Sequence, residues 1–472
     1  MSKCGFAVIS DLHYFSPKLT DGKRAYELRS GSDQKCLLES GAIIDAAFEK
    51  LKKDDTIDYV LIPGDLSDDG EICSHLEIAE KLSELNKYKK VFVTTATHDF
   101  CCDENARYYF GDKPSPCKET ADIPFLRKIY APFGENGAIA KFETKEGLCS
   151  YVAELKGDVR LLALNDDKSG KGTSGFDNEH LSWIISQIKE AKQSGKTVVI
   201  MQHHVVVPHF TGLLAGGGIC CGERQKIAES YAKNGADILF VGHSHWQNIT
   251  EYEADNGNFM LQVNVGSLCG YPSPIFKVCI SDGKACMHTE YVEEFVFNGK
   301  KQTGAYIKKH TLSLIENVLT PAVEGDKNEF CDRLNALGVK SDIVLKLFFL
   351  IKKLAAYIKS VDVGHFSRAV NLLTFGKGID KKSAEEVKER LVYDIICNIF
   401  LSLFDGGLNR YEKGSPVYNV VSDFVSIPSR AVRNLSFVPV KAKNLLDEIH
   451  ETVLLLMDDV ADNNNICFEL NF

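Results

Sequence analysis

The sequence contains no C-x-x-C pair, although 15 of its 472 residues are cysteines. Zinc ribbons and thioredoxin-like redox proteins depend on such closely spaced pairs, so both classes are excluded. An odd number of cysteines, scattered through apparent strands and helices, is more typical of reduced thiols than of a disulfide framework. The adjacent pairs Cys101/Cys102 and Cys220/Cys221 fall in predicted loops. We interpret them as free thiols, with a redox role as the alternative.

The chain also lacks a surplus of positive charge and a long uninterrupted apolar run. Its formal net charge is −10, whereas a nucleic-acid polymer or an anionic membrane attracts a basic surface. The most apolar stretch, VLKLFFLIKKLAAYIK, is broken by lysines and is shorter than the about 20 apolar residues of a membrane span. We therefore expect no nucleic-acid polymer as partner and no membrane span. Packing within a helical domain is the favoured interpretation of this stretch, and a surface-lying amphipathic helix is the alternative.

The N-terminal residues MSKCGFAVISDLH lack the charged region and apolar stretch of a signal peptide, because they enter a predicted strand at once. This pattern predicts a cytoplasmic protein. The sequence also shows no internal repeat and no low-complexity tract. The glycine run 216–218 is not followed by the Lys-Ser/Thr of a phosphate-binding loop, so a nucleotide-binding P-loop is excluded there.

What the sequence does contain is a series of metal-ligand-type residues, each directly after an apolar run. The runs FAVIS, DYVLIPG, KVFVTTA, TVVIMQ and ADILFVG are typical of buried strands in a layered α/β fold. The residues that follow them are, in order, Asp11 and His13, Asp65, the segment 97–100 (THDF), His203, and His243 and His245. Ligand sites of open α/β sheets lie at the carboxyl ends of the strands, so we expect these side chains to converge at one sheet edge.

In order and spacing, these motifs resemble the calcineurin-like metallophosphoesterases, whose pattern is D-x-H, G-D, G-N-H-D/E, H and G-H-x-H. The resemblance covers roughly residues 5–281. It implies an α/β fold in four layers, the αββα sandwich of that family. It also implies hydrolysis of a small phosphoester substrate by attack of a metal-bound hydroxide.

The resemblance further implies a centre of two divalent metal ions. The implied ligands are Asp11, His13 and His245 for one ion, His203 and His243 for the second, and Asp65 as the bridge between them. A mixed set of carboxylate and imidazole ligands suits Mn²⁺, Fe²⁺ or Zn²⁺. Two such ions about 3.5–4 Å apart can hold both the attacking and the leaving oxygen of an in-line displacement.

The third motif supplies the implied catalytic residue and also departs from the family. By resemblance, His98 stabilises or protonates the leaving oxygen, and Asp99 orients its ring. Thr97 stands where the family has a metal-binding Asn. Because the threonine hydroxyl is the poorer ligand, we expect the second ion to be held weakly. The alternative is that Asp99 or a shifted loop residue supplies the missing ligand while Thr97 only shapes the pocket.

Several residues near these motifs are expected at or beside the pocket. His204 is the second choice for the role of His203, because the two are adjacent. His209 would line the pocket with Thr97 and Asp99, as a substrate contact or as a surface residue. Basic residues at 23, 24 and 29 would either bring positive charge to the pocket mouth or form a solvated loop face, and the second interpretation is favoured.

The length of the chain favours two domains, which we place at residues 1–290 and 291–472. Helical spacing in the first domain predicts helices at 34–53, 74–86, 178–193 and 223–234, with Asn178 as an N-cap. Beyond residue 290, helices are predicted at 306–319, 341–359, 383–404 and 443–460.

This layout resembles the bacterial cyclic-nucleotide phosphodiesterase-like enzymes, which carry a helical C-terminal extension. That likeness implies a phosphodiester substrate, such as a cyclic nucleotide. The alternative is a degenerate family member with one weak metal site, which binds a ligand or partner without efficient turnover.

Overall fold

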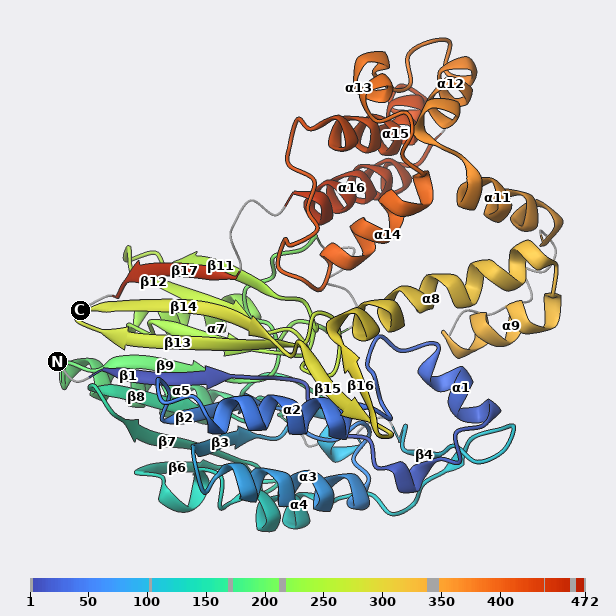
Figure 1. Cartoon of the computed structure of the whole chain (residues 1–472). Coiled ribbons are helices and arrows are strands. Elements are labelled where there is room, and N and C mark those ends of the chain that lie inside the picture. Colours follow the sequence, from blue (N-terminus) through green and yellow to red (C-terminus); the bar gives the residue numbers. More distant parts are fainter. Residues whose placement is uncertain are drawn as a thin grey trace. The chain divides into compact units, whose positions relative to one another are not determined.

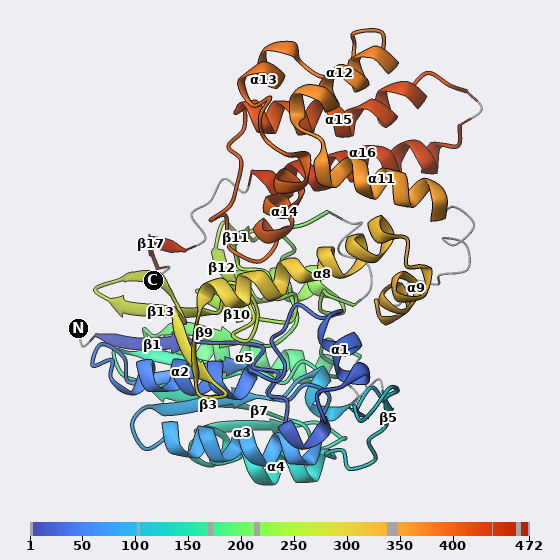
Figure 2. The ribbon, with the colours of Figure 1, turned by 45° about the vertical axis from the view of Figure 1, so that its right-hand side comes forward.

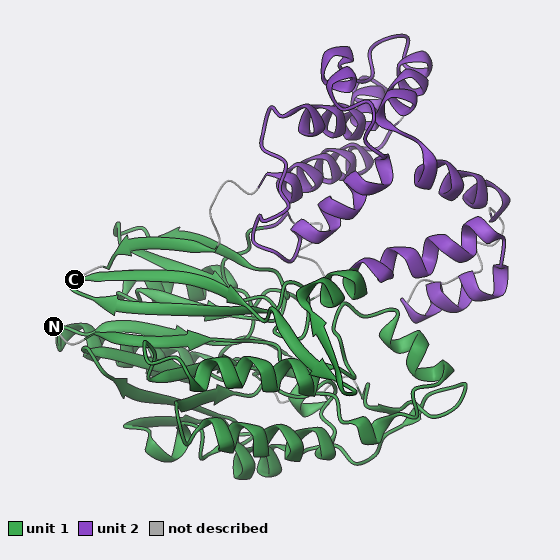
Figure 3. Cartoon of the chain, viewed as in Figure 1, with its two compact units in different colours: residues 1–209, 218–311, 463–472 green, residues 210–217, 312–462 purple. Residues whose placement is uncertain are grey.

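A computed structural model describes residues 3–101, 104–168, 173–211, 218–337, 348–436, 438–458 and 464–470. The chain forms two compact units (Figure 3). The first unit comprises residues 1–209, 218–311 and 463–472, and the second comprises residues 210–217 and 312–462. The first unit thus runs past the residue 290 at which we placed a boundary, and it also takes in the last residues of the chain.

The first sheet has six strands, which lie in the order β17, β14, β13, β1, β2, β3 (Figure 1). Their bounds are Asn465–Glu469, Lys284–Tyr291, Pro274–Ser281, Cys4–Val8, Tyr59–Pro63 and Lys90–Thr94. The strands β1, β2 and β3 are parallel to one another. The strands β13, β14 and β17 extend the sheet in antiparallel pairs from β1. The carboxyl ends of β1, β2 and β3 therefore share one edge of the sheet.

The second sheet has seven strands in the order β11, β12, β10, β9, β8, β7, β6. Their bounds are Asn248–Glu253, Phe259–Asn264, Ile238–Val241, Thr197–Met201, Val159–Ala163, Cys149–Leu155 and Ala140–Glu143. The four strands β12, β10, β9 and β8 are parallel. They are short and rich in Val, Ile, Leu and Met because both faces of the sheet are covered.

The two sheets pack face to face over a core that includes Phe6 and Leu61 from the first sheet and Val199 and Phe240 from the second. Helices cover the outer faces (Figures 1 and 2). On the first sheet these are α2 (Ser40–Lys52), α3 (Ile72–Leu85) and α4 (Ile123–Tyr130). On the second they are α5 (Asn178–Gln193) and α7 (Arg224–Lys233). The predicted αββα sandwich is confirmed.

Short elements complete the first unit. They are α1 (Arg24–Ser30), the strand pair β4 (Arg107–Tyr108) and β5 (Ser115–Pro116), the hairpin β15 (Glu294–Phe297) and β16 (Lys300–Thr303), and three 3₁₀ turns at Pro17–Leu19, Thr97–Phe100 and Glu135–Gly137. Two details differ from the prediction. The helix predicted from residue 34 begins only at Ser40. The N-cap of α5 is Asp177 instead of Asn178, because the Asp177 carboxylate accepts the His180 backbone N–H at 2.8 Å.

The second unit is helical, as predicted. Its helices are α8 (Gly304–Glu324, which begins in the first unit), α9 (Lys327–Ala336), α11 (Phe348–Ser360), α12 (Val363–Leu373), α13 (Lys381–Glu386), α14 (Val392–Ser402), α15 (Pro416–Val432) and α16 (Val440–Met457). Residues 341–347 of the helix predicted over 341–359 lie outside the described residues. None of the helices within the described ranges is long and apolar enough to cross a membrane.

One predicted helix, 383–404, is wrong, since the chain forms α13 and α14 with a break between them. The reason lies in the backbone hydrogen bonds of the break. The carbonyls of Lys388 and Arg390 accept the N–H groups of Gly364 and Val363, at the start of α12, at 3.1 and 2.8 Å. Carbonyls used in this way cannot continue a helix, and the periodicity of the sequence does not reveal a partner so far away.

The expectation of reduced thiols throughout is also wrong at one pair. Cys286 on β14 and Cys467 on β17 form a disulfide. The other cysteines that the structure describes are free. Because β17 follows the whole second unit in sequence, its pairing with β14 could not be inferred from cysteine spacing.

Candidate metal centre

The residues after β1, β2, β9 and β10 converge, as expected for the carboxyl ends of parallel strands. In the first group, Asp11, His13 and His245 place their ligand atoms within 4.8 Å of one another. The Nε2 atoms of His13 and His245 are 3.0 Å apart, and His245 Nε2 lies 3.4 Å from Asp11 Oδ1. His13 of the D-x-H motif and His245 of the G-H-x-H motif are 232 residues apart in sequence. The two motifs thus build one three-residue group.

In a second group, Asp65, His203 and His243 also place their ligand atoms within 4.8 Å of one another. His203 Nε2 lies 3.1 Å from Asp65 Oδ2 and 3.0 Å from His243 Nδ1. The two groups share an edge, because Asp65 Oδ2 also lies 3.6 Å from His13 Nε2. The carboxylate of Asp65 therefore stands between the two sets of imidazoles, which is the position that a bridging ligand requires.

Five of these six residues have a left-handed backbone. The φ angles are 52° at Asp11, 40° at His13, 51° at Asp65, 66° at His243 and 60° at His245. Residues other than glycine seldom adopt positive φ, and such strain concentrates at functional sites. These left-handed residues follow β1, β2 and β10, the strands that carry the motifs to the sheet edge.

The glycines of the G-D and G-H-x-H motifs have a steric role here. A Cβ atom on Gly64 would lie 2.8 Å from His203 Nδ1, and one on Gly242 would lie 2.3 Å from Asp11 Oδ2. Both distances are far below a van der Waals contact. Each glycine therefore lets a ligand from another strand approach the backbone closely.

The donor set fits divalent ions with mixed nitrogen and oxygen preference. The Nδ1 atom of His203 lies 2.8 Å from the carbonyl of Pro63, and a proton donated there leaves Nε2 free for a metal. Burial raises the pKa of Asp11 and Asp65, but hydrogen bonds and the charges of the surrounding histidines outweigh it and hold both pKa values well below the usual range. Both carboxyl groups are therefore ionised, as metal ligands must be.

His98 lies beside the same groups but is held by a residue that we did not predict. Its Nδ1 atom lies 3.0 Å from Asp69 Oδ1 and 2.5 Å from the carbonyl of Asp68, while its backbone N–H donates to Asp65 Oδ1 at 3.1 Å. Burial lowers the pKa of His98, but the charge of Asp65 and the hydrogen bond to Asp69 outweigh it and raise that pKa to about 9. Because Nδ1 faces these two oxygens, Nε2 is the ring nitrogen that remains to face a substrate.

The expected role of Asp99 is wrong. Its carboxylate accepts the backbone N–H groups of Leu66, Ser67 and Ala96 at 2.9 to 3.0 Å, and its side chain is fully buried. Asp99 therefore fixes the backbone around Asp65 and does not orient the His98 ring. The same hydrogen bonds leave it unsuited to replace the missing Asn as a ligand. The sequence offered one indication of this role for Asp69. It is one of the acidic residues that follow Asp65 in the PGDLSDDG motif.

Thr97 and His204 meet at the second group. Thr97 Oγ1 lies 3.3 Å from His204 Nε2, and the other ring nitrogen of His204 lies 3.2 Å from Asp166 Oδ1. The ring of His204 packs on that of His243 with 4.4 Å between the centroids. His203, and not the reserve His204, is thus the residue that joins Asp65, while His204 lies beside the group next to Thr97.

The nearby basic residues are paired with carboxylates. Lys35 Nζ lies 2.8 Å from Asp68 Oδ1, and Arg29 Nη2 lies 3.0 Å from Asp68 Oδ2. Arg29 also pairs with Asp33. Of the three basic residues considered above, Lys23 is exposed and pairs with Asp21, as expected for a solvated loop. Lys35 is within 3.4 Å of His13 Nδ1, and its spacing in sequence gave no sign of this.

The ring of His209, which we expected to line the pocket, lies 6.0 Å from the ring of Trp246. Trp246 follows His245 directly in the chain, and His209 itself is in neither of the two described groups. Burial lowers its pKa to about 3, which leaves the ring neutral. The glycines at 216 and 217 lie outside the described residues.

The family model for calcineurin-like phosphoesterases matches residues 5–247, which is just over half of the chain. The chain belongs to this family. The matched segment begins in β1 and ends two residues after His245, so it contains both three-residue groups. A calcineurin-like phosphoesterase is a hydrolase of phosphoric esters, and this chain carries clusters of Asp and His side chains that could bind metal ions.

Solved structures that are similar to this chain have low sequence identity to it. A dimetal phosphatase from Danio rerio is 12% identical, with 64% of this chain and 98% of that chain covered and a TM-score of 0.43. A NAD nucleotidase from Haemophilus influenzae is 13% identical, with 77% and 62% covered and a TM-score of 0.35. A putative 5′-nucleotidase from Staphylococcus aureus is 17% identical, with 59% and 51% covered and a TM-score of 0.35. No protein of curated function matches the sequence.

Proposed function

We propose that this phosphoesterase hydrolyses a small phosphodiester, such as a cyclic nucleotide, with two divalent ions held at the sheet edge. The observation that carries the proposal is the position of Asp65, whose Oδ2 lies 3.1 Å from His203 Nε2 and 3.6 Å from His13 Nε2. Asp11, His13 and His245 would hold one ion, and His203 and His243 the other. When bound, the ions would supply an activated water and positive charge around the phosphate.

The protein's own contribution to the reaction centres on His98. The charge of Asp65 and the hydrogen bond to Asp69 raise its pKa and so favour the protonated ring. The hydrogen bonds from Nδ1 to Asp69 and to the carbonyl of Asp68 fix the ring, so that Nε2 carries the proton that is offered to substrate. We assign His98 as the general acid that protonates the leaving alcohol oxygen. Asp69 is then the residue that positions it.

The charges around the site favour a diester over a monoester. A phosphomonoester carries up to two negative charges at neutral pH, and a diester carries one. Apart from the proposed metal ions, Lys35 and Arg29 are nearby protein cations that could neutralise a second charge, and both are already paired with Asp68 and Asp33. His98 is similarly paired with Asp69. A substrate with a single negative charge on its phosphate suits such a pocket better.

Hydrolysis of bis-p-nitrophenyl phosphate and of p-nitrophenyl phosphate, with added Mn²⁺ and after chelation, tests the proposal. We expect activity that is lost on chelation, returns with Mn²⁺ and is higher on the diester. A cyclic nucleotide serves as the second diester. Preference for the monoester would overturn the diester assignment alone. Absence of turnover with Mn²⁺, Fe²⁺ and Zn²⁺ would overturn the assignment as an enzyme. It would favour the alternative, a family member that binds its ligand without turnover.

A further inference from the structure

Three cysteines form a row across three neighbouring strands of the first sheet. Cys279 on β13 lies directly opposite Cys286 on β14, and Cys286 lies directly opposite Cys467 on β17. In antiparallel pairs, side chains that lie directly opposite point to the same face of the sheet. The three sulfur atoms are therefore neighbours on one face, with Cys286 in the middle of the row.

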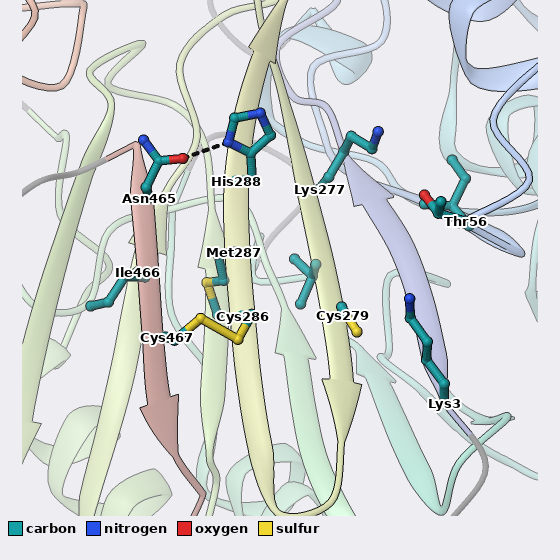
Figure 4. A pocket seen from close by; sticks show the side chains of 12 residues that line it. Lys3, Thr56, Lys277, Cys279, Cys286, Met287, His288, Asn465, Ile466 and Cys467 are labelled. Atoms are coloured by element: carbon teal, nitrogen blue, oxygen red, sulfur yellow. Dashed lines mark hydrogen bonds between the residues drawn. A yellow bond between two sulfur atoms is a disulfide. The ribbon is translucent and has the colours of Figure 1, made fainter.

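This face of the sheet opens to solvent through a cleft. Along β13, Val278 and Ile280 are buried in the core, whereas Cys279 between them is only partly buried. Cys467 is exposed. The cleft has a volume of about 530 Å³, and the three cysteines line it together with Lys3 and Lys277 among others (Figure 4). Small molecules can therefore reach all three sulfur atoms.

The middle cysteine is bonded on one side and has a free thiol on the other. Cys286 and Cys467 form the disulfide, with their Cα atoms 4.1 Å apart, and Cys279 is free. Opposite residues in antiparallel strands have Cα atoms about 4.5–5.5 Å apart. Disulfides span Cα separations of about 4.4–6.8 Å. The register therefore places Cys286 between two possible disulfide partners, Cys467 on one side and Cys279 on the other.

We propose that Cys279, Cys286 and Cys467 form a thiol–disulfide exchange site that is open to small thiols through this cleft. In the exchange, the thiolate of Cys279 attacks Sγ of Cys286. The bond between Cys286 and Cys467 breaks, a bond between Cys279 and Cys286 forms, and Cys467 leaves as a thiolate that takes up the proton lost by Cys279. The disulfide count is unchanged, so the step needs no oxidant or reductant. A small thiol that enters the cleft can also open either disulfide through a mixed disulfide.

The exchange changes how the last strand is attached. In one state, Cys467 ties β17 covalently to β14, and a hydrogen bond between His288 and Asn465 lies beside the disulfide (Figure 4). In the other state, β17 keeps only its hydrogen bonds and side-chain packing. Since β17 and β14 both belong to the first unit, the site controls whether the last strand of that unit is covalently tied to its neighbour.

The variant Cys467→Ser tests the pairing. After incubation with oxidised glutathione, which is reduced to two thiols for each protein disulfide formed, peptide mapping by mass spectrometry should show a bond between Cys279 and Cys286. Cys149→Ser is the matched control, because Cys149 lies on another sheet opposite Glu143 and should leave the mapped disulfide between Cys286 and Cys467 unchanged. Free thiols or only glutathione adducts at Cys279 and Cys286 in Cys467→Ser would overturn the proposal.

The wild-type protein tests the exchange itself. At pH 8.5 with a small amount of 2-mercaptoethanol, followed by quenching with iodoacetamide, we expect both linkages in the wild type and a single linkage in Cys279→Ser. A thermal melt of each variant confirms that it is folded. If the wild type passes from one disulfide directly to three free thiols at every thiol concentration, the exchange step is refuted. Neither result depends on phosphoesterase activity, because Cys279 lies on a different strand from every proposed metal ligand.

Discussion

The hydroxyl group of Thr97 lies 3.3 Å from Nε2 of His204, next to the group formed by Asp65, His203 and His243. The position that holds an amide ligand in the family pattern is thus occupied by a hydroxyl that faces an imidazole. Threonine is also shorter than asparagine, and its χ1 is restricted. The second ion would keep three protein ligands.

Thr97→Asn should therefore tighten the second ion. The amide oxygen reaches farther and is a better ligand, so the Mn²⁺ concentration for half-maximal activity should fall. Calorimetric metal titration measures the two affinities directly. In the wild type we expect one tight and one weak ion. Thr97→Val, which has a similar shape but no hydroxyl, is the control and should leave the weak affinity unchanged. Two equally tight ions in the wild type would contradict this prediction.

Asp65→Ala should abolish binding of both ions and activity together. The carboxylate stands between the imidazoles of His203 and His13, so its loss removes the ligand that both ions would share. Metal content by mass spectrometry checks the first part, and diester hydrolysis checks the second. Asp45→Ala, at an exposed carboxylate paired with Lys81, should keep both properties. Retention of two ions in Asp65→Ala would exclude the bridging role.

His98→Gln should keep the ions and lower kcat by about 10²–10⁴-fold, the range typical for loss of a general acid. Asp69→Asn should also lower kcat, but by a smaller factor. The Asp68 carbonyl would still accept a hydrogen bond from His98 Nδ1 and hold the ring in place. Metal content and kcat are measured for both variants. The assignment fails if His98→Gln loses metal, since His98 would then be a ligand.

Gly242→Ala should weaken binding of the first ion at little cost to the fold. A Cβ atom there would lie 2.3 Å from Asp11 Oδ2 and 2.2 Å from Ser10 Oγ, so the carboxylate must move. The affinity of the tighter ion, measured by titration, should fall. Gly137→Ala is the control, because an added Cβ there meets only Lys90 Nζ at 3.9 Å. Equal metal affinities for both variants would show that the close approach at Gly242 is not needed.

His180 should make the first unit sensitive to acid. It is buried between Phe142 and Phe176 and bonded to Ser150, and burial lowers its pKa from 6.5 to about 4. Between these values the unfolded chain binds a proton that the folded protein does not. The stability advantage over His180→Gln should therefore fall as the pH drops from 6.5 toward 4, by up to about 1.4 kcal/mol per pH unit. Urea unfolding of both proteins measures it, and an advantage independent of pH would refute it.

The sequence was sufficient to predict the layers and the six residues that converge, and the reason is local. Each of these residues directly follows a buried strand, and parallel strands carry their carboxyl ends to a common edge. Asp11 and His245 come together because β1 and β10 both obey this rule. Which residue orients His98 was not predictable in the same way. Asp69 contacts the His98 ring because the loop after β2 folds back. The Asp99 carboxylate instead accepts hydrogen bonds from backbone N–H groups.

The disulfide and the division of one predicted helix were missed for a different reason. Both depend on pairing between segments that are distant in the chain. Cys286 and Cys467 are separated by 181 residues, and only the register of β17 on β14 makes them partners. The break before α14 depends on carbonyls that bond to the start of α12. Periodicity describes one segment at a time, so such contacts leave no trace in it.

The return of β17 to the first sheet makes the second unit an insertion within the phosphoesterase fold and not an appendage after it. A truncation that removes residues from 312 onward would also remove the strand that borders β14. β14 would then present a row of unpaired N–H and C=O groups to solvent, and such an open edge promotes aggregation between molecules. An isolated phosphoesterase unit therefore needs residues 464–470 joined back to it, by a linker that replaces the helices.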